Sequence, residues 1–236
     1  MSPESSVRSP AAHTDKAFEA DLREVREKIL TMGGKVEDQI ARSMRALTER
    51  DSELGEQVKE GDLEINRLEV DIDDLCRRTL ALRQPAASDL RLITTALKIV
   101  TDLERIGDEA VNIAERAIEL NQTPPLAPYV DLPRLAELAQ NQVTKALDAF
   151  VRADPETAEE VLGNDDQLDD LFVKIFNELL GFMMEDSRTI RRATSLVSIC
   201  KYLERIGDHA MNVAEMVIYM VRGTDVRHPK SRTAPA

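Results

Sequence analysis

The chain contains few of the residues that build sheet-rich domains. Tryptophan is absent, aromatic residues make up 3% of the 236 positions, and there are only nine glycines and ten prolines. This scarcity argues against a fold based on β-sheets. The hydrophobic fraction of 42% is still ample for a core. The composition therefore favours long helices packed through leucine, isoleucine, valine, alanine and methionine.

Excess positive charge and long apolar runs are also missing. The formal net charge is −13, and no basic groove or aromatic stacking platform is visible, which argues against nucleic-acid binding. The charge also opposes tight binding of free phosphate, and it favours cations or a basic partner surface. No apolar run approaches the roughly 20 residues of a membrane span. The first fourteen residues lack an apolar signal core, so we expect a cytoplasmic protein.

Cysteine and histidine are too few and too scattered to suggest catalysis. Cys76 and Cys200 stand alone at non-equivalent places, so we expect buried thiols rather than a disulfide. His209 is expected at the surface, and the pair Met183–Met184 in the core. The chain has no glycine-rich phosphate loop and no Ser/His/Asp or Cys/His set, so we do not expect an enzyme.

One thirteen-residue segment occurs twice, one hundred positions apart. The segments 103–115 and 203–215 share the pattern Leu-Glu-Arg-Ile-Gly-Asp, followed by Ala, Asn, Ala and Glu at the same spacing. Such self-similarity indicates an internal duplication. On a helix, Glu104, Asp108 and Asn112 fall along one edge of a broad apolar face. Gly107 lies on the apolar side, where we expect another helix to approach closely.

The rest of the chain divides into helices separated by breaker residues. We expect a disordered tail over 1–13, and a glycine pair at 33–34 forms a weak point in the first helix. Ser88 is predicted to cap the third helix, and Asp154 to cap a fifth helix that runs unbroken to about residue 185. Each half yields three helices, so the sequence predicts an all-α fold of two tandem three-helix bundles. One six-helix bundle is the alternative, and a long coiled coil is less favoured. The expected helices span about 14–50, 53–82, 88–120, 133–153, 155–185 and 187–221. The expected units are a first repeat over 14–120, a proline-rich linker over 121–133, a second repeat over 134–222 and a tail over 223–236.

Acidic residues on the second helix of each half add a second stripe. Asp62, Asn66, Glu69 and Asp73 share one helical face, and Asp165 and Asp169 take the corresponding place in the second half. Carboxylates gathered from two helices repel one another unless a cation neutralises them. Oxygen ligands suit Mg²⁺, Ca²⁺ or Mn²⁺ and tolerate Fe or Zn. The alternative to a metal site is that the acidic stripes are solvated helix faces whose carboxylates pair with Arg105 and Arg205. The Glu-x-x-His signature of ferritin-type di-iron sites is absent.

Taken together, several segments resemble the PhoU family. They are the two Leu-Glu-Arg-Ile-Gly-Asp motifs, Thr-Met-Gly-Gly at 31–34, Arg-Gln-Pro-Ala-Ala-Ser-Asp-Leu-Arg at 83–91, Met-Glu-Asp-Ser-Arg-Thr-Ile at 184–190 and Asp-Val-Arg-His at 225–228. The resemblance implies two similar three-helix bundles in a bacterial cytoplasmic protein, often a homodimer. It also implies a negative regulator of the phosphate-starvation response and of phosphate uptake. The implied partners are the ATPase subunit of a phosphate ABC transporter and a two-component sensor histidine kinase.

The resemblance also assigns candidate metal ligands, because some members of the family bind multinuclear metal clusters. Mg, Mn, Fe and Zn all stay open as the metal. Asn66 stands where the second half has Asp169, which weakens the first cluster. Alternative functions are a metal-binding helical scaffold with a broader role in phosphate or metal homeostasis, a storage protein and a metal-free adaptor. Since no anion site is visible, the transporter is expected to sense phosphate and this chain to relay the signal. The ligands implied are Glu104, Asp108, Glu204 and Asp208, faced by Glu69, Asp73, Asp165 and Asp169.

Overall fold

Long helices account for nearly all of the described chain. The computed structural model describes residues 16–83, 85–126, 131–163 and 165–227, and these contain no β-strand. Within them, no helix is both long and apolar enough to cross a membrane. The predicted N-terminal tail and part of the predicted linker and C-terminal tail lie outside the described residues. The helices are α1 (Lys16–Thr48), α2 (Ser52–Leu82), α3 (Ala87–Asn121), α4 (Leu132–Arg152), α5 (Pro155–Leu162), α6 (Asp165–Glu185), the 3₁₀ turn η1 (Ser187–Thr189) and α7 (Ile190–Arg222).

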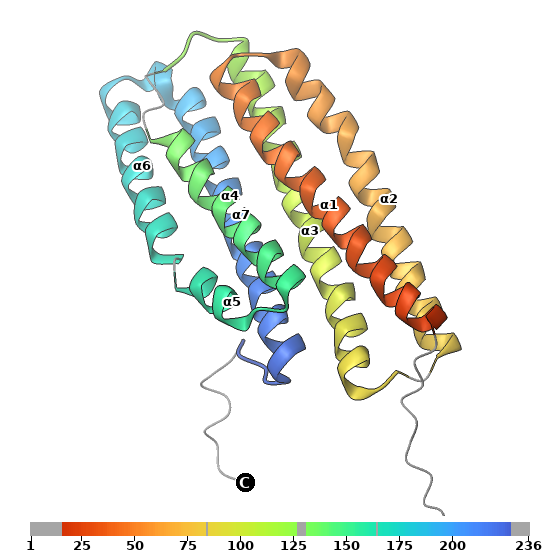
Figure 1. The fold of residues 1–236 in the computed structure, drawn as a ribbon. Coiled ribbons are helices and arrows are strands. Elements are labelled where there is room, and N and C mark those ends of the chain that lie inside the picture. Colours follow the sequence, from red (N-terminus) through yellow and green to blue (C-terminus); the bar gives the residue numbers. More distant parts are fainter. Residues whose placement is uncertain (1–15, 84, 127–130, 164, 228–236) are drawn as a thin grey trace, which may run out of the picture.

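The helices form two bundles that meet along α3 and α7, which confirms the predicted all-α fold (Figure 1). Helices α1, α2 and α3 pack on one another, and α4, α5 and α6 pack around α7. The contact between α3 and α7 is the most extensive of any helix pair, and α1 also touches α4. The buried apolar side chains make one cluster that runs through both bundles. The two repeat motifs therefore lie on the two central helices.

The prediction of one unbroken fifth helix is wrong. Helix α5 ends at Leu162 with Gly163 as its C-cap, and α6 begins at Asp165. Glycine weakens a helix by roughly 1 kcal/mol relative to alanine, and an added Cβ at Gly163 would meet only carbonyl oxygens of the same helix. The start of α5 agrees with prediction, because the Asp154 carboxylate accepts hydrogen bonds from the backbone N–H groups of Glu156 and Thr157.

The predicted cap at Ser88 is also wrong. Helix α3 has Ala86 as its N-cap, with no side-chain hydrogen bond, and Ser88 lies in the first turn. The extended backbone of Ala86 directly follows Pro85 and starts the helix two residues early. Near the start of α7, the Asp186 carboxylate accepts from the N–H of Arg188, and so caps the 3₁₀ turn rather than α7 itself.

The glycine pair in α1 produces close packing rather than a break. Helix α1 continues through Gly33 and Gly34. A Cβ added at Gly33 would lie 2.7 Å from Cδ1 of Leu147 on α4, whereas one added at Gly34 would meet nothing within 4 Å. Gly33 thus lets the first helix of one bundle approach the first helix of the other.

Both cysteines are buried and unpaired, as predicted. Burial raises the pKa of the Cys76 thiol to about 11 and that of Cys200 to about 12. The expectation for Met183–Met184 is wrong for Met184, which is 80% exposed, while Met183 packs against the core. The pair stands at the end of α6, where successive residues point in directions about 100° apart, so that one can pack on the core while the next faces solvent.

Candidate functional site at the repeat motifs

Each motif helix places its glycine against a buried glutamine from the first helix of its own bundle. A Cβ at Gly107 would lie 3.4 Å from Oε1 of Gln39, and one at Gly207 would lie 2.6 Å from Oε1 of Gln142. The predicted close approach at these glycines is therefore made by side chains and not by another helix backbone. Because glycine has no side chain, each amide can reach the backbone of the motif helix.

The sequence analysis missed these two glutamines. Gln39 is 4% exposed and Gln142 is 5% exposed, and the Oε1 atom of each has no hydrogen-bond partner within the described residues. The Gln39 amide nitrogen donates to the carbonyl of Val58, 3.3 Å away. A signal was present, because each glutamine interrupts an otherwise apolar helical face. Unpaired buried amide oxygens are rare, so both positions are candidate polar sites.

In the first bundle, four of the acidic residues singled out from the sequence gather between α2 and α3, and one of them, Asp62, lies near Gly107 as Gln39 does. Asp62 and Glu69 lie on α2, and Glu104 and Asp108 lie on α3. Burial is the main reason that the pKa values of Asp62, Glu69 and Glu104 are raised. Repulsion adds to it, since Asp108 raises the pKa of all three and Glu69 raises that of Glu104. The cluster therefore disfavours its own ionisation.

Hydrogen bonds and one arginine offset part of this repulsion. The Asn66 amide donates to Oδ2 of Asp62 at 2.8 Å, while Oδ1 of Asp62 is buried without a partner. Arg105 lies 3.6 Å from a carboxylate oxygen of both Glu104 and Asp108. Asp73, the remaining predicted ligand of this bundle, pairs with Arg77 at 3.8 Å, and its charge also raises the pKa of Glu69. The alternative of a solvated face paired with arginine thus holds for part of the cluster.

The second bundle does not repeat this cluster. Ile65 of α2 packs near Gly107, and Leu168 of α6 packs near Gly207 in the same way. Ile65 and Leu168 therefore occupy equivalent positions in the two bundles. Counting on from these residues, Phe172 and Phe176 take the places of Glu69 and Asp73. Their rings form a tilted pair, with centroids 6.4 Å apart and an angle of 30° between the planes.

The remaining predicted ligands of the second bundle are dispersed. Glu204 pairs with Lys201 at 2.5 Å, and that ammonium group also lies over the ring of Phe172. Asp169 and Asp208 are exposed, and the side chain of Asp165 is outside the described part. A lysine and an aromatic side chain thus lie beside Glu204, whereas carboxylates from α2 and α3 gather beside Glu104.

Among the described residues, no three His, Cys, Asp or Glu side chains are placed to hold one metal ion. The first cluster has the oxygen donors that a hard cation prefers, but these donors do not converge on one point. Binding would need the side chains to change rotamer. The metal set of the sequence analysis stays a prediction.

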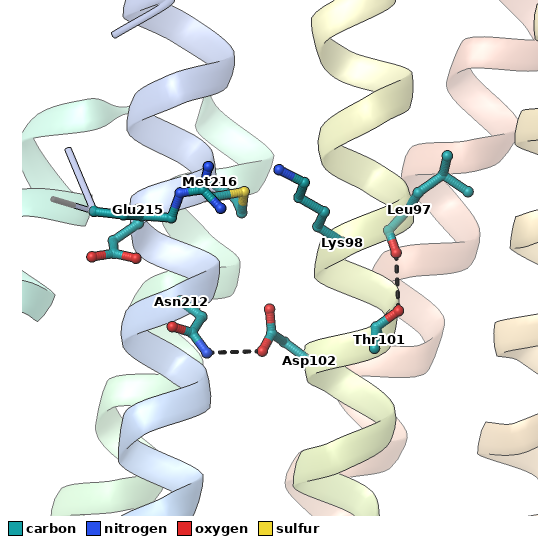
Figure 2. Close-up of a pocket in the computed structure, with 8 residues that line it drawn as sticks. Leu97, Lys98, Thr101, Asp102, Asn212, Glu215 and Met216 are labelled. Atoms are coloured by element: carbon teal, nitrogen blue, oxygen red, sulfur yellow. Dashed lines mark hydrogen bonds between the residues drawn. The ribbon is translucent and has the colours of Figure 1, made fainter. Parts of the chain in front are cut away.

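Charged groups also join the two motifs across the seam between α3 and α7. Arg205 pairs with Glu109 at 3.1 Å, and Nδ1 of His209 lies 2.9 Å from Oδ1 of Asp102. The Asn212 amide donates to that same Asp102 oxygen at 3.0 Å, as Figure 2 shows. The prediction that His209 lies at the surface is wrong in part, because only 24% of its side chain is exposed. Sequence spacing cannot reveal this contact between residues far apart in the chain.

A cavity of about 380 Å³ opens beside this seam. In Figure 2, Lys98 extends from α3 toward α7, where Glu215 and Met216 line the opposite side. Asp102 and Arg227 complete a lining that contains charges of both signs. The mixed charge gives this cavity no preference for an anion or a cation.

Both bundles match one family model. Residues 29–117 and 132–217 each match the PhoU domain. The chain belongs to the PhoU family. This confirms the resemblance read from the repeated motifs, and each matched range contains one of them.

Relatives in the PhoU family are similar over almost the whole chain. A Pseudomonas putida protein named phosphate-specific transport system accessory protein PhoU homolog is 49% identical over 92% of this chain and 85% of its own length. The protein named phosphate-specific transport system accessory protein PhoU from Escherichia coli strain K12 is 39% identical, over 92% of this chain and 90% of its own.

Solved structures of the PhoU family show the same fold. The crystal structure of PhoU from Pseudomonas aeruginosa has a TM-score of 0.85 and 48% identity, and it covers 88% of this chain and all of that one. The phosphate transport system regulatory protein PhoU from Streptococcus pneumoniae has a TM-score of 0.81 and 29% identity, with 89% of this chain and 99% of that chain covered.

Proposed function

We propose that this chain is a negative regulator of the phosphate-starvation response and of phosphate uptake. It acts as a cytoplasmic adaptor between the ATPase subunit of a phosphate ABC transporter and a two-component sensor histidine kinase. Family membership supports this role, as do relatives named as accessory proteins of the phosphate-specific transport system. We propose no catalytic role, in keeping with an accessory family.

An exposed apolar stripe on α6 is the observation that carries the adaptor role. Val173, Phe176, Leu180 and Met184 follow helical spacing and are 53%, 40%, 42% and 80% exposed. A Cβ added at Gly181 would meet nothing within 4 Å, so this side of the helix is open. Contiguous exposed apolar patches on a folded protein mark interaction surfaces.

Carboxylates rim this stripe and indicate the charge of the partner. Asp169, Asp170, Glu178 and Glu185 are all exposed on the same helix. A partner surface with an apolar ridge between basic side chains fits such a face. On α2 of the first bundle, Leu63 and Val70 are also exposed, but they stand apart from each other among charged residues. The stripe therefore distinguishes the second bundle as the docking side.

The test measures binding of the full chain to the cytoplasmic region of the kinase and, separately, to the ATPase subunit. The variant Phe176→Asp with Leu180→Asp places charge in the stripe and is expected to weaken binding at least about tenfold. Leu63→Asp on α2 is the matched control, with binding unchanged. Unchanged affinity of the stripe variant for both partners would refute docking through α6.

We also propose that the chain forms a homodimer and binds a divalent cation. Cation binding is the basis of the alternative function, a metal-binding helical scaffold. Light scattering of the purified chain tests the dimer, and a monomer mass at working concentration would exclude it.

Metal analysis of untagged protein tests the bound cation. The variants Glu104→Gln and Asp108→Asn are expected to lower any metal content. Equal content in those variants would remove the first cluster as the site. The cation would neutralise the carboxylates whose pKa values are raised by burial and mutual repulsion.

A further inference from the structure

A second cavity, at the junction of the two repeats, has the opposite character from the acidic cluster. It has a volume of about 210 Å³ and lies between the end of α3 and the beginning of α7. Its charged lining consists of Arg191, Arg192 and Glu119, and its polar lining of Gln122, Thr123 and Ser195. A cavity with two arginines is unexpected in a chain of net charge −13.

The Glu119 carboxylate is already neutralised by a neighbour on its own helix. Arg116 donates to Oε2 of Glu119 at 2.9 Å. The arginines at the other side of the cavity lack such a partner: within the described residues, neither Arg191 nor Arg192 forms an ion pair with a carboxylate. Arg192 donates to the backbone carbonyl of Pro124 at 3.0 Å, and it acts on Asp186 only through its charge. The cavity therefore keeps an excess of uncompensated positive charge.

The carbonyl end of α3, which would repel an anion, is also satisfied from elsewhere. Arg50 donates through one nitrogen to the carbonyls of Asn121 and Thr123, at 2.7 Å each. These bonds reduce the partial negative charge that the C-terminus of a helix presents. The charges of Arg191 and Arg192 are therefore available to interact with a ligand bound in the cavity.

The size of the cavity limits the ligand to a small group. Its volume of about 210 Å³ is below the roughly 300 Å³ at which pockets for larger organic ligands begin. The cavity volume is still several times the roughly 30 Å³ that one water molecule occupies in the liquid. Guanidinium groups bind phosphate oxygens through paired, charge-assisted hydrogen bonds. The Gln122 amide and the two hydroxyl groups can add neutral hydrogen bonds to the same oxygens.

We propose that this junction cavity is a binding site for the phosphate group, held by Arg191 and Arg192. The site joins Thr123, where the chain leaves the first repeat, to the helix that carries the second motif. Occupancy would therefore tighten the junction between the repeats. The inference stands on this cavity alone and goes beyond the adaptor role, which would survive its failure. It also replaces the expectation from the sequence that the chain has no anion site.

The experiment is calorimetric titration of the full chain with inorganic phosphate at low salt, with sodium chloride of equal ionic strength as reference. We expect saturable binding of one phosphate per chain. Arg191→Gln should weaken it at least about tenfold, since a charge-assisted contact is lost. No hydrogen bond of the Arg191 side chain to another described residue would be lost, so the circular dichroism spectrum and melting temperature should not change. Arg188→Gln is the matched control, because Arg188 is exposed, pairs with Asp186 and does not line the cavity.

A second variant tests the sign of the charge effect. Glu119→Gln removes the one carboxylate of the cavity and should tighten phosphate binding severalfold. Glycerol 2-phosphate, titrated in parallel, distinguishes the source of the group. Tighter binding of this ester would point to a phosphorylated molecule, and weaker binding to free phosphate. Absence of saturable binding, an equal response to sodium sulfate, or wild-type affinity of Arg191→Gln would overturn the proposal.

Discussion

At the residue scale, the absence of a side chain decides how closely the two bundles can approach. Gly33 and Gly34 are neighbours on α1 but face different surroundings. The methyl groups of Leu147 on α4 cover Gly33, whereas Gly34 faces open space. The sequence shows two equivalent glycines, and the structure gives a packing role to only one of them.

These neighbours provide a matched pair of alanine substitutions. Gly33→Ala should lower the free energy of unfolding by about 1–3 kcal/mol, because a Cβ there would lie 2.7 Å and 2.9 Å from the two methyl groups of Leu147. Gly34→Ala should raise it by about 0.5–1 kcal/mol through helix propensity alone. Urea denaturation of both variants measures the difference. Equal effects of the two substitutions would show that α4 does not constrain Gly33.

At the scale of the element, α3 and α7 carry the same motif in different electrostatic surroundings. On α3, Glu104 faces other carboxylates, and burial and their repulsion raise its pKa. On α7, Glu204 faces Lys201. The difference has two sources: α2 supplies Glu69 where α6 supplies Phe172, and α7 itself carries Lys201 where α3 has Thr101.

The pH dependence of Glu104→Gln follows from the sign of this shift. A carboxyl whose pKa is raised on folding stabilises the folded state most at low pH, where it is protonated, and this contribution is lost as the pH rises through the raised pKa. At pH 7 the glutamine variant should therefore be more stable than the wild type by roughly a few tenths of a kilocalorie per mole. The gain should shrink below the ordinary glutamate pKa of about 4.3. Thermal melts between pH 3.5 and 7, without divalent cations, measure it.

Glu204→Gln is the control for this experiment. The substitution removes the partner of Lys201, so it should give no gain at pH 7. If both glutamine variants were stabilised equally, the asymmetry between the two acidic stripes would be refuted.

At the scale of the whole molecule, the two bundles behave as one body because α3 and α7 share the core and a polar seam. Glu109 is 7% exposed and is held from both sides, by Arg205 of the other repeat and by Asn112 of its own helix. A buried carboxylate that loses such a partner costs more than an exposed ion pair contributes.

Arg205→Met should therefore lower the free energy of unfolding by about 1–2 kcal/mol, a value reduced because the arginine side chain is 53% exposed. Adding Glu109→Gln should restore part of the loss in a double-mutant cycle. Arg45→Met breaks an exposed pair between Arg45, on α1, and Glu49, just after α1, and should leave the stability almost unchanged. Unfolding should remain a single transition, and separate melting of the two repeats would contradict the shared core.

The sequence by itself determined the helical class, the duplication and the family, because helical periodicity and the repeated motif are local patterns. It also indicated that both cysteines are buried, since each stands alone with no second cysteine to pair with. Only the tertiary structure decided which acidic stripe is a cluster, where Gln39 and Gln142 point, and that Met184 is exposed. It also brought Arg191 and Arg192 to the cavity beside Thr123. The physical reason is the same in each case: burial and electrostatic neighbours depend on which helices pack together. Residues far apart in the sequence acquire their charge environment only when α2 packs on α3 and α3 packs on α7.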